Sequence, residues 1–168
     1  SVDSLFAGSN DAQMVNNLSV NQTVTNGDYV ANLEDNRLIN IINIESGSEV
    51  QISGNHYEVG SMAIDGDLLQ YTTRTLQGNE GIYQLNEINL TTGEISTLKE
   101  ETSADTPDFY VNQDTDGLNS VYVDNGAVVM NNETVYDFGN NSLPSVNGDS
   151  IAFASEQTEN NETTQNVV

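Results

Sequence analysis

The chain has 168 residues, 26 acidic residues against three basic ones, a formal net charge of −23 and no cysteine. Its length suits one domain that buries about two-thirds of the surface of the unfolded chain, and the missing cysteine excludes disulfide and thiol chemistry. Nucleic acid and anionic membrane surfaces are disfavoured as partners, because both are bound through clustered cations.

The sequence pattern of the first half of the chain predicts short β-strands. Residues 4–15 contain two apolar runs around a glycine and are expected to form strands. A four-strand pattern then occurs twice, over 19–53 and 58–99. In the second copy the first two strands are separated by Asp65-Gly66-Asp67, and in the first copy by Asn26-Gly27-Asp28. Runs of β-branched and aromatic residues between such turns are typical of an antiparallel meander.

The two patterns are copies of each other. Asn, Ile and Gly recur with the same spacing in 39–47 and in 85–93, so one strand and its turn are duplicated. The extra residues of the second copy fall around 76–81, in a predicted hairpin loop, where insertions are tolerated. Weaker copies follow over 107–138 and 143–155.

Four-stranded units repeating every 40 to 45 residues or so are typical of β-propeller blades, because one small sheet cannot bury its faces alone. We therefore expect an all-β, propeller-like array of about four four-stranded antiparallel blades in one domain, residues 1–155. The array is either a small propeller closed by strands 4–15 or part of a larger propeller or multi-chain assembly. Residues 156–168 form a polar tail or a final strand, and their composition favours the tail.

The second copy resembles blades of TolB-like propellers. The resemblance lies in a strand of small residues, the Asp-Gly-Asp turn, a strand that contains Tyr71, and a strand that leads through Ile88-Asn89-Leu90 to Gly93-Glu94. It implies the fold only, because propellers of this kind share no single activity.

The best candidate for a metal site is the segment 112–120. Oxygen-bearing side chains at alternate positions, followed by glycine, can surround a calcium ion. The segment resembles the calcium loops of integrin α-chain propellers, which implies four ligands: Asn112, Asp114, Asp116 and Ser120. Ser120 stands where that family usually has an acidic residue. The alternative is a polar β-turn, in which Asp and Gly are favoured by turn geometry alone.

Three turns place an aspartate directly after a glycine, at Asp28, Asp67 and Asp149. These carboxylates predict either a cation-holding ring at one channel mouth or tight turns, and turn geometry favours the second. Several tyrosines are expected on strands, filling contacts between blades or forming an exposed platform for a sugar: Tyr29, Tyr71, Tyr83, Tyr110, Tyr122 and Tyr136.

No catalytic set is apparent. His56 is the only histidine and is expected in a loop or at a blade edge, and no serine lies in a nucleophile-elbow pattern. Arg37 and Arg74 cannot easily form the arginine set that an anionic substrate would need. We expect a protein that is not an enzyme, with no cofactor other than a calcium ion.

The charge indicates a high-salt environment. At net −23 self-repulsion would destabilise the fold in dilute buffer, whereas molar salt shortens the screening length to about 3 Å. No stretch has the apolar length of a membrane span, no signal peptide is recognised, and the start at Ser1 suggests that a preceding segment was removed or left out. Six Asn-x-Ser/Thr sequons are glycosylation candidates: Asn17, Asn21, Asn89, Asn132, Asn140 and Asn161.

These expectations favour a surface-exposed recognition or adhesion module of an extreme halophile or its virus, such as a spike or host-attachment protein. It would act outside the cell, on a cell or virion surface, and bind a protein or glycan there. The alternatives are a structural component of a virion, cell-surface lattice or filament, and a fragment of a glycan-processing propeller enzyme. A homo-oligomer or larger assembly is expected.

Overall fold

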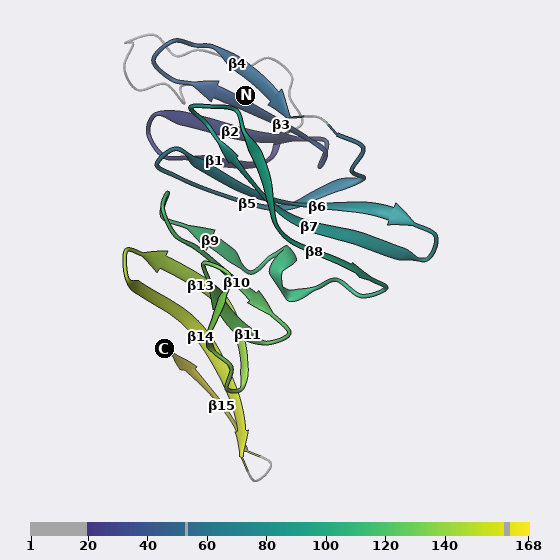
Figure 1. Cartoon of the computed structure of the whole chain (residues 1–168), viewed down its shortest axis with the longest axis vertical. Coiled ribbons are helices and arrows are strands. Elements are labelled where there is room, and N and C mark those ends of the chain that lie inside the picture. Colours follow the sequence, from purple (N-terminus) through teal and green to yellow (C-terminus); the bar gives the residue numbers. More distant parts are fainter. Residues whose placement is uncertain (1–19, 53, 160–161) are drawn as a thin grey trace. The chain divides into compact units, whose positions relative to one another are not determined.

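The computed structural model describes residues 20–52, 54–159 and 162–168 (Figure 1). The chain divides into two compact units, Ser1–Gly54 and Asn55–Val168. The strands expected over 4–15 lie outside the described residues. Among those residues, no helix is long and apolar enough to span a membrane.

The first unit is one antiparallel sheet whose neighbouring strands follow one another in the chain: β1 (Val20–Thr25), β2 (Tyr29–Glu34), β3 (Leu38–Asn43) and β4 (Glu49–Ile52). Its two central strands carry most of the buried residues, and Asn32 lies opposite Asn40 in their register. Both asparagines are buried, and Asn32 accepts a hydrogen bond from the Thr23 hydroxyl.

The second unit begins with a sheet of the same order: β5 (Glu58–Asp65), β6 (Leu68–Gln77), β7 (Glu80–Asn89) and β8 (Ile95–Ser103). Asn86 is buried on its third strand, as Asn40 is on β3. Each accepts a hydrogen bond from the fourth strand, Asn86 from Thr97 Oγ1 at 2.8 Å and Asn40 from Gln51 Nε2 at 2.9 Å. The β5–β8 sheet therefore repeats the structure of the β1–β4 sheet, as the sequence predicts.

The extra residues of the second copy do not form the loop that the sequence predicts. They lengthen β6 and β7 to ten residues each, whereas β2 and β3 have six. Cross-strand pairing continues to Gln77 and Glu80, which leaves only Gly78 and Asn79 in the turn. Gly78 has φ +62°, which suits such a tight hairpin turn.

Two further sheets complete the second unit. After the short 3-10 helix η1 (Asp108–Tyr110), the first has β9 (Gln113–Thr115), β10 (Ser120–Asp124), β11 (Ala127–Met130) and β12 (Glu133–Tyr136), and the second has β13 (Asn140–Asn147), β14 (Ser150–Glu159) and β15 (Glu162–Val167).

One local prediction for these sheets is wrong, and one alternative is decided. Tyr110 lies in η1 rather than on a strand, because Pro107, with φ −69°, directs the chain into the 3-10 turn. Of the two expectations for residues 156–168, a polar tail or a final strand, the described residues show the strand: β14 extends to Glu159, and its residues 154–159 pair with β15. Thr-rich β-formers and cross-strand pairing outweigh the low apolar content there.

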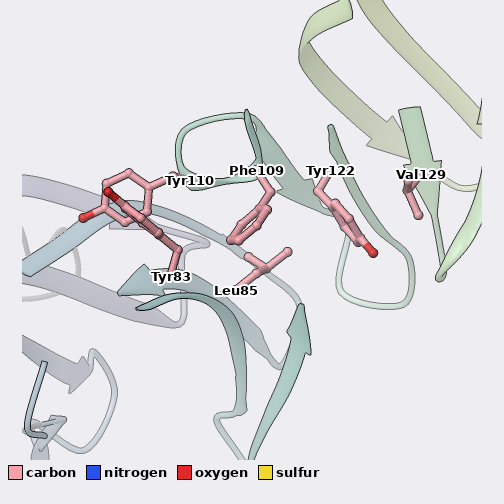
Figure 2. Packing of buried hydrophobic residues seen from close by; sticks show 6 residues of the cluster. All are labelled: Tyr83, Leu85, Phe109, Tyr110, Tyr122 and Val129. Atoms are coloured by element: carbon pink, nitrogen blue, oxygen red, sulfur yellow. The ribbon is translucent and has the colours of Figure 1, made fainter. Parts of the chain in front are cut away.

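The fold class is the expected one: all-β, with propeller-like antiparallel blades, of which the described part of the chain shows three with four strands and one with three. In the second unit the sheets pack through η1. Figure 2 shows Phe109 of η1 between Leu85 of β7 and Tyr122 of β10, with Tyr83, Tyr110 and Val129 in the same cluster. A second cluster joins the next two sheets through Val121, Val128, Val146 and Phe153.

Candidate functional site

Three predicted calcium ligands, one on β9 and one on each side of it, form a row of hydrogen bonds to β13 and to the turn that follows it. Asn112 Oδ1 accepts from the Leu143 amide at 2.9 Å, and Asp114 Oδ2 accepts from the Val146 amide at 3.0 Å. Asp116 Oδ2 accepts from the Gly148 amide at 2.6 Å. Side chains at alternate positions of one strand therefore satisfy backbone N–H groups along the edge of the neighbouring sheet.

Asp116 also fixes its own turn. Its Oδ1 accepts from the amides of Leu118 and Asn119, at 2.9 and 2.7 Å. Its Oδ2 accepts from Asn119 Nδ2 at 3.1 Å in addition to Gly148. These bonds, the one from the Asn119 amide foremost, lower the pKa of Asp116 far below its ordinary value.

The turn packs directly against the turn of the preceding blade. A Cβ on Gly117 would lie 3.0 Å from the Asp65 carbonyl oxygen and 3.1 Å from the Gly66 Cα atom. Gly117 has φ +91°, which side chains disfavour, so both geometry and space require glycine here. Three glycine-containing turns, one from each sheet of this unit, are linked by these contacts and by the Asp116–Gly148 bond: Asp65-Gly66, Asp116-Gly117 and Asn147-Gly148.

Ser120, the fourth predicted ligand, points elsewhere. Its hydroxyl donates to Glu87 Oε2 at 3.2 Å, and its amide donates to Asn131 Oδ1. In the described ranges no group of three His, Cys, Asp or Glu side chains could hold a metal ion. The geometry of 112–120 therefore favours the structural turn, in which amide donors occupy the oxygens that a cation would need.

Removing divalent cations tests this assignment. We expect the midpoint of thermal unfolding in molar KCl to be the same with EGTA as with added CaCl₂ at equal ionic strength, because N–H donors already bind Oδ2 of Asp114 and both carboxylate oxygens of Asp116. Differential scanning calorimetry measures the midpoint. If EGTA lowers the midpoint, added calcium reverses the change and Asp114→Asn abolishes it, the segment binds calcium after all.

The aspartates that follow turn glycines are exposed and do not shape their turns. That role belongs to the residue before the glycine. Asn26 Oδ1 accepts from the amides of Asp28 and Tyr29, and Asp65 Oδ1 accepts from the Gly66 amide. The turns thus follow ordinary Asx chemistry.

The sequons differ in their surroundings. Asn89 Oδ1 caps its turn by accepting from the amides of Thr91 and Thr92. Asn132 is exposed at positive φ in the β11–β12 turn, and Asn140 is exposed at the start of β13. Asn17 and Asn161 lie outside the described residues, and of Asn21 only the backbone, in β1, is described.

A different group of residues combines aromatic rings with one of the three basic residues of the sequence. We call it the Arg74 cluster: Tyr57, Glu58, Arg74, Tyr83 and Tyr110. The Arg74 guanidinium lies over the Tyr57 ring, 5.2 Å from its centroid. Arg74 Nε is 3.1 Å from Glu58 Oε1, an ion pair in which the N–H is not aligned for a hydrogen bond.

Two buried tyrosines, Tyr83 and Tyr110, support this ion pair. The Tyr110 hydroxyl donates to Glu58 Oε1 at 3.0 Å, and the Tyr83 and Tyr110 rings meet edge to face with centroids 5.2 Å apart. Burial and the bond to Glu58 raise the pKa of Tyr110, so its hydroxyl stays a donor. Desolvation by itself lowers the pKa of Arg74. The hydrogen bond to Tyr83 and the charge of Glu58 outweigh it, so the pKa of Arg74 is raised above its ordinary value.

Comparisons with known proteins add little beyond these observations. No known protein family matches the sequence, and no curated protein matches it. One similar solved structure is an oligogalacturonate lyase in complex with manganese, with 12% identity, a TM-score of 0.47, and coverage of 85% of this chain and 51% of the lyase chain. Another is BamB from Moraxella catarrhalis, with 12% identity, a TM-score of 0.26, and coverage of 79% of this chain and 68% of BamB. The chain thus spans about half the length of the lyase.

Proposed function

We propose that this chain is a non-enzymatic recognition or adhesion module that acts on a cell or virion surface in a high-salt environment, and that its partner is a surface glycan or glycoprotein. The observation that carries the proposal is the Arg74 cluster. In this cluster the Tyr57 side chain is 53% exposed. The Arg74 guanidinium beside it is held by Glu58, which accepts a hydrogen bond from buried Tyr110. A rigid aromatic side chain at the surface is the usual anchor of a binding site.

Composition supports the same proposal. The charge of −23 suits an extreme halophile or its virus, because molar salt screens the repulsion that would otherwise oppose folding. A sheet scaffold held together by side-chain-to-backbone bonds, as between β9 and β13, keeps surface groups in place without loop ordering on binding.

Binding to intact cells tests this function. The fluorescently labelled chain is added to cells of extreme halophiles in molar KCl, and cell-bound fluorescence is measured by flow cytometry. We expect saturable binding that unlabelled chain displaces. Binding that is not saturable, or that unlabelled chain does not displace, would contradict the proposal.

A second candidate function, a structural component that assembles with copies of itself, is favoured by the edge of β15. Among residues 20–52, 54–159 and 162–168 the other three sheets have four strands, whereas the last has three, with β15 at its edge. All six β15 side chains are exposed. An edge strand without lysine or proline is prone to pair with another chain.

The partner that suits this edge is β15 of a second copy. In a two-fold antiparallel pair centred on Gln165, Gln165 would face Gln165 of the second copy and Thr163 would face Val167, so no carboxylates would oppose each other. Phe153 and Val168 exchange both backbone bonds, so the alternation of the ladder directs the Gln165 amide away from β14.

Gln165→Pro removes this outward donor and retains the pairing with β14, whereas Gln165→Ala retains the donor. In molar KCl we expect the parent chain and Gln165→Ala to sediment as dimers and Gln165→Pro as a monomer, measured by analytical ultracentrifugation. A monomeric parent chain, or a dimeric Gln165→Pro, would contradict assembly through β15.

A further inference from the structure

We propose that the Arg74 cluster is a carbohydrate site that takes the pyranose ring of a neutral sugar. This inference rests on the proposed recognition function and assigns it a ligand class and a position. The cluster is formed by Tyr57 just before β5, the beginning of β5, the end of β6, the beginning of β7 and η1, at the opposite end of the sheet from the Asp65-Gly66 turn.

The apolar part of the site is the Tyr57 ring. One face of the ring lies against the Arg74 guanidinium, and the side chain is still half exposed, which leaves the opposite face for a ligand. Leu76, 56% exposed, lies two residues beyond Arg74 and therefore on the same side of β6. An aromatic face beside an aliphatic side chain suits the C–H face of a pyranose, since the ring quadrupole is negative there.

The polar part is the Glu58–Arg74 pair. Both Tyr110 and Arg74 contact Glu58 through Oε1, so Oε2 is the acceptor that a ligand hydroxyl can reach within the described part of the chain. A guanidinium has five N–H donors, and the contacts with Glu58 and Tyr83 use only part of them. An acceptor and a donor side by side match two neighbouring hydroxyls, one donating and one accepting.

Charge decides between neutral and acidic sugars. Glu58 already pairs with Arg74, so a carboxylate on the ligand would compete with Glu58 for the guanidinium and be repelled by it. The other charges of the chain are overwhelmingly negative as well. A neutral hexose meets neither penalty, because its hydroxyls replace hydrogen bonds to water without adding charge.

The test is a glycan array in molar KCl that carries neutral hexose glycans and the matching hexuronic acid glycans, followed by titration of the best binder with the parent chain and variants. We expect neutral glycans to bind. Tyr57→Ala should weaken binding at least about tenfold, or about 1.4 kcal/mol, and Tyr57→Phe by less than about threefold, because the ring remains. Phe138→Ala, which removes an aromatic side chain that is 71% exposed, is the matched control and should bind like the parent chain.

The outcomes separate this site from the function. Binding of neutral glycans that Tyr57→Ala leaves unchanged would overturn the site and leave the function standing. Binding of hexuronic acid glycans alone would overturn the ligand class. Saturable cell binding without any glycan binding would overturn the carbohydrate site and leave a protein partner. Loss of cell binding as well would overturn both proposals.

Discussion

Replacing Phe109 by alanine is expected to lower the free energy of unfolding of the second unit by about 3–5 kcal/mol. Phe109 is fully buried, packs between Leu85 and Tyr122, and meets the Tyr122 ring edge to face with centroids 6.5 Å apart (Figure 2). Two sheets meet at this ring, so its removal leaves a cavity that neither backbone can fill without moving.

Urea unfolding in molar KCl, followed by far-UV circular dichroism, measures the change. Phe138→Ala is the matched control. Phe138 is largely exposed and contacts Tyr136 edge to face, so its loss should cost less than about 1 kcal/mol. Equal midpoints for the two variants would contradict packing of these sheets through η1.

The repeated architecture could be predicted because its signals are local. Asn43 and Asn89 each cap the turn after a third strand, and each turn has a glycine at positive φ, Gly47 or Gly93. Such turn chemistry depends on a few neighbouring residues and is therefore visible in the sequence. The η1 turn was missed because Phe109-Tyr110-Val111 has the composition of a strand.

The Arg74 cluster could not be predicted, because a bulge creates it. Counting back from Asp65, which pairs with Leu68, an unbroken hairpin would place Val59 opposite Arg74. The register shifts between Val59 and Met62, so Glu58 faces Arg74 instead. A one-residue shift exchanges the faces of a strand, and the sequence alone gives little sign of it beyond Gly60.

The pattern of 112–116 was ambiguous for a physical reason. A cation and a row of backbone amides both require oxygen atoms at alternate positions on one side of a strand. Only the position of β13 beside β9 distinguishes the two, and that position depends on contacts distant in the sequence, such as Val121 with Val146.

Replacing Asp116 by alanine is expected to cost about 2 kcal/mol of the free energy of unfolding of the second unit. Four hydrogen bonds end on this carboxylate, and the two from Asn119 and Gly148 amides are the shortest, at 2.7 and 2.6 Å. A hydrogen bond to a charged group is worth about 1.5–3 kcal/mol when buried. The total is smaller here, because the turn is partly exposed and solvent replaces some of the bonds.

The effect should depend on pH in a defined direction. The pKa of Asp116 is lowered in the folded protein, so the unfolded chain binds this proton more readily. The stabilisation is therefore complete above the pKa of the unfolded aspartate, about 3.9, and is lost as the pH falls below it. Asp116→Asn, which keeps one acceptor oxygen, should differ from the parent chain at neutral pH and approach it in acid.

Asp67→Ala, at an exposed position in the equivalent turn, should change stability by less than about 0.5 kcal/mol. If urea unfolding from pH 7 to pH 3 gives Asp67→Ala and Asp116→Ala the same cost, the carboxylate does not link these blades.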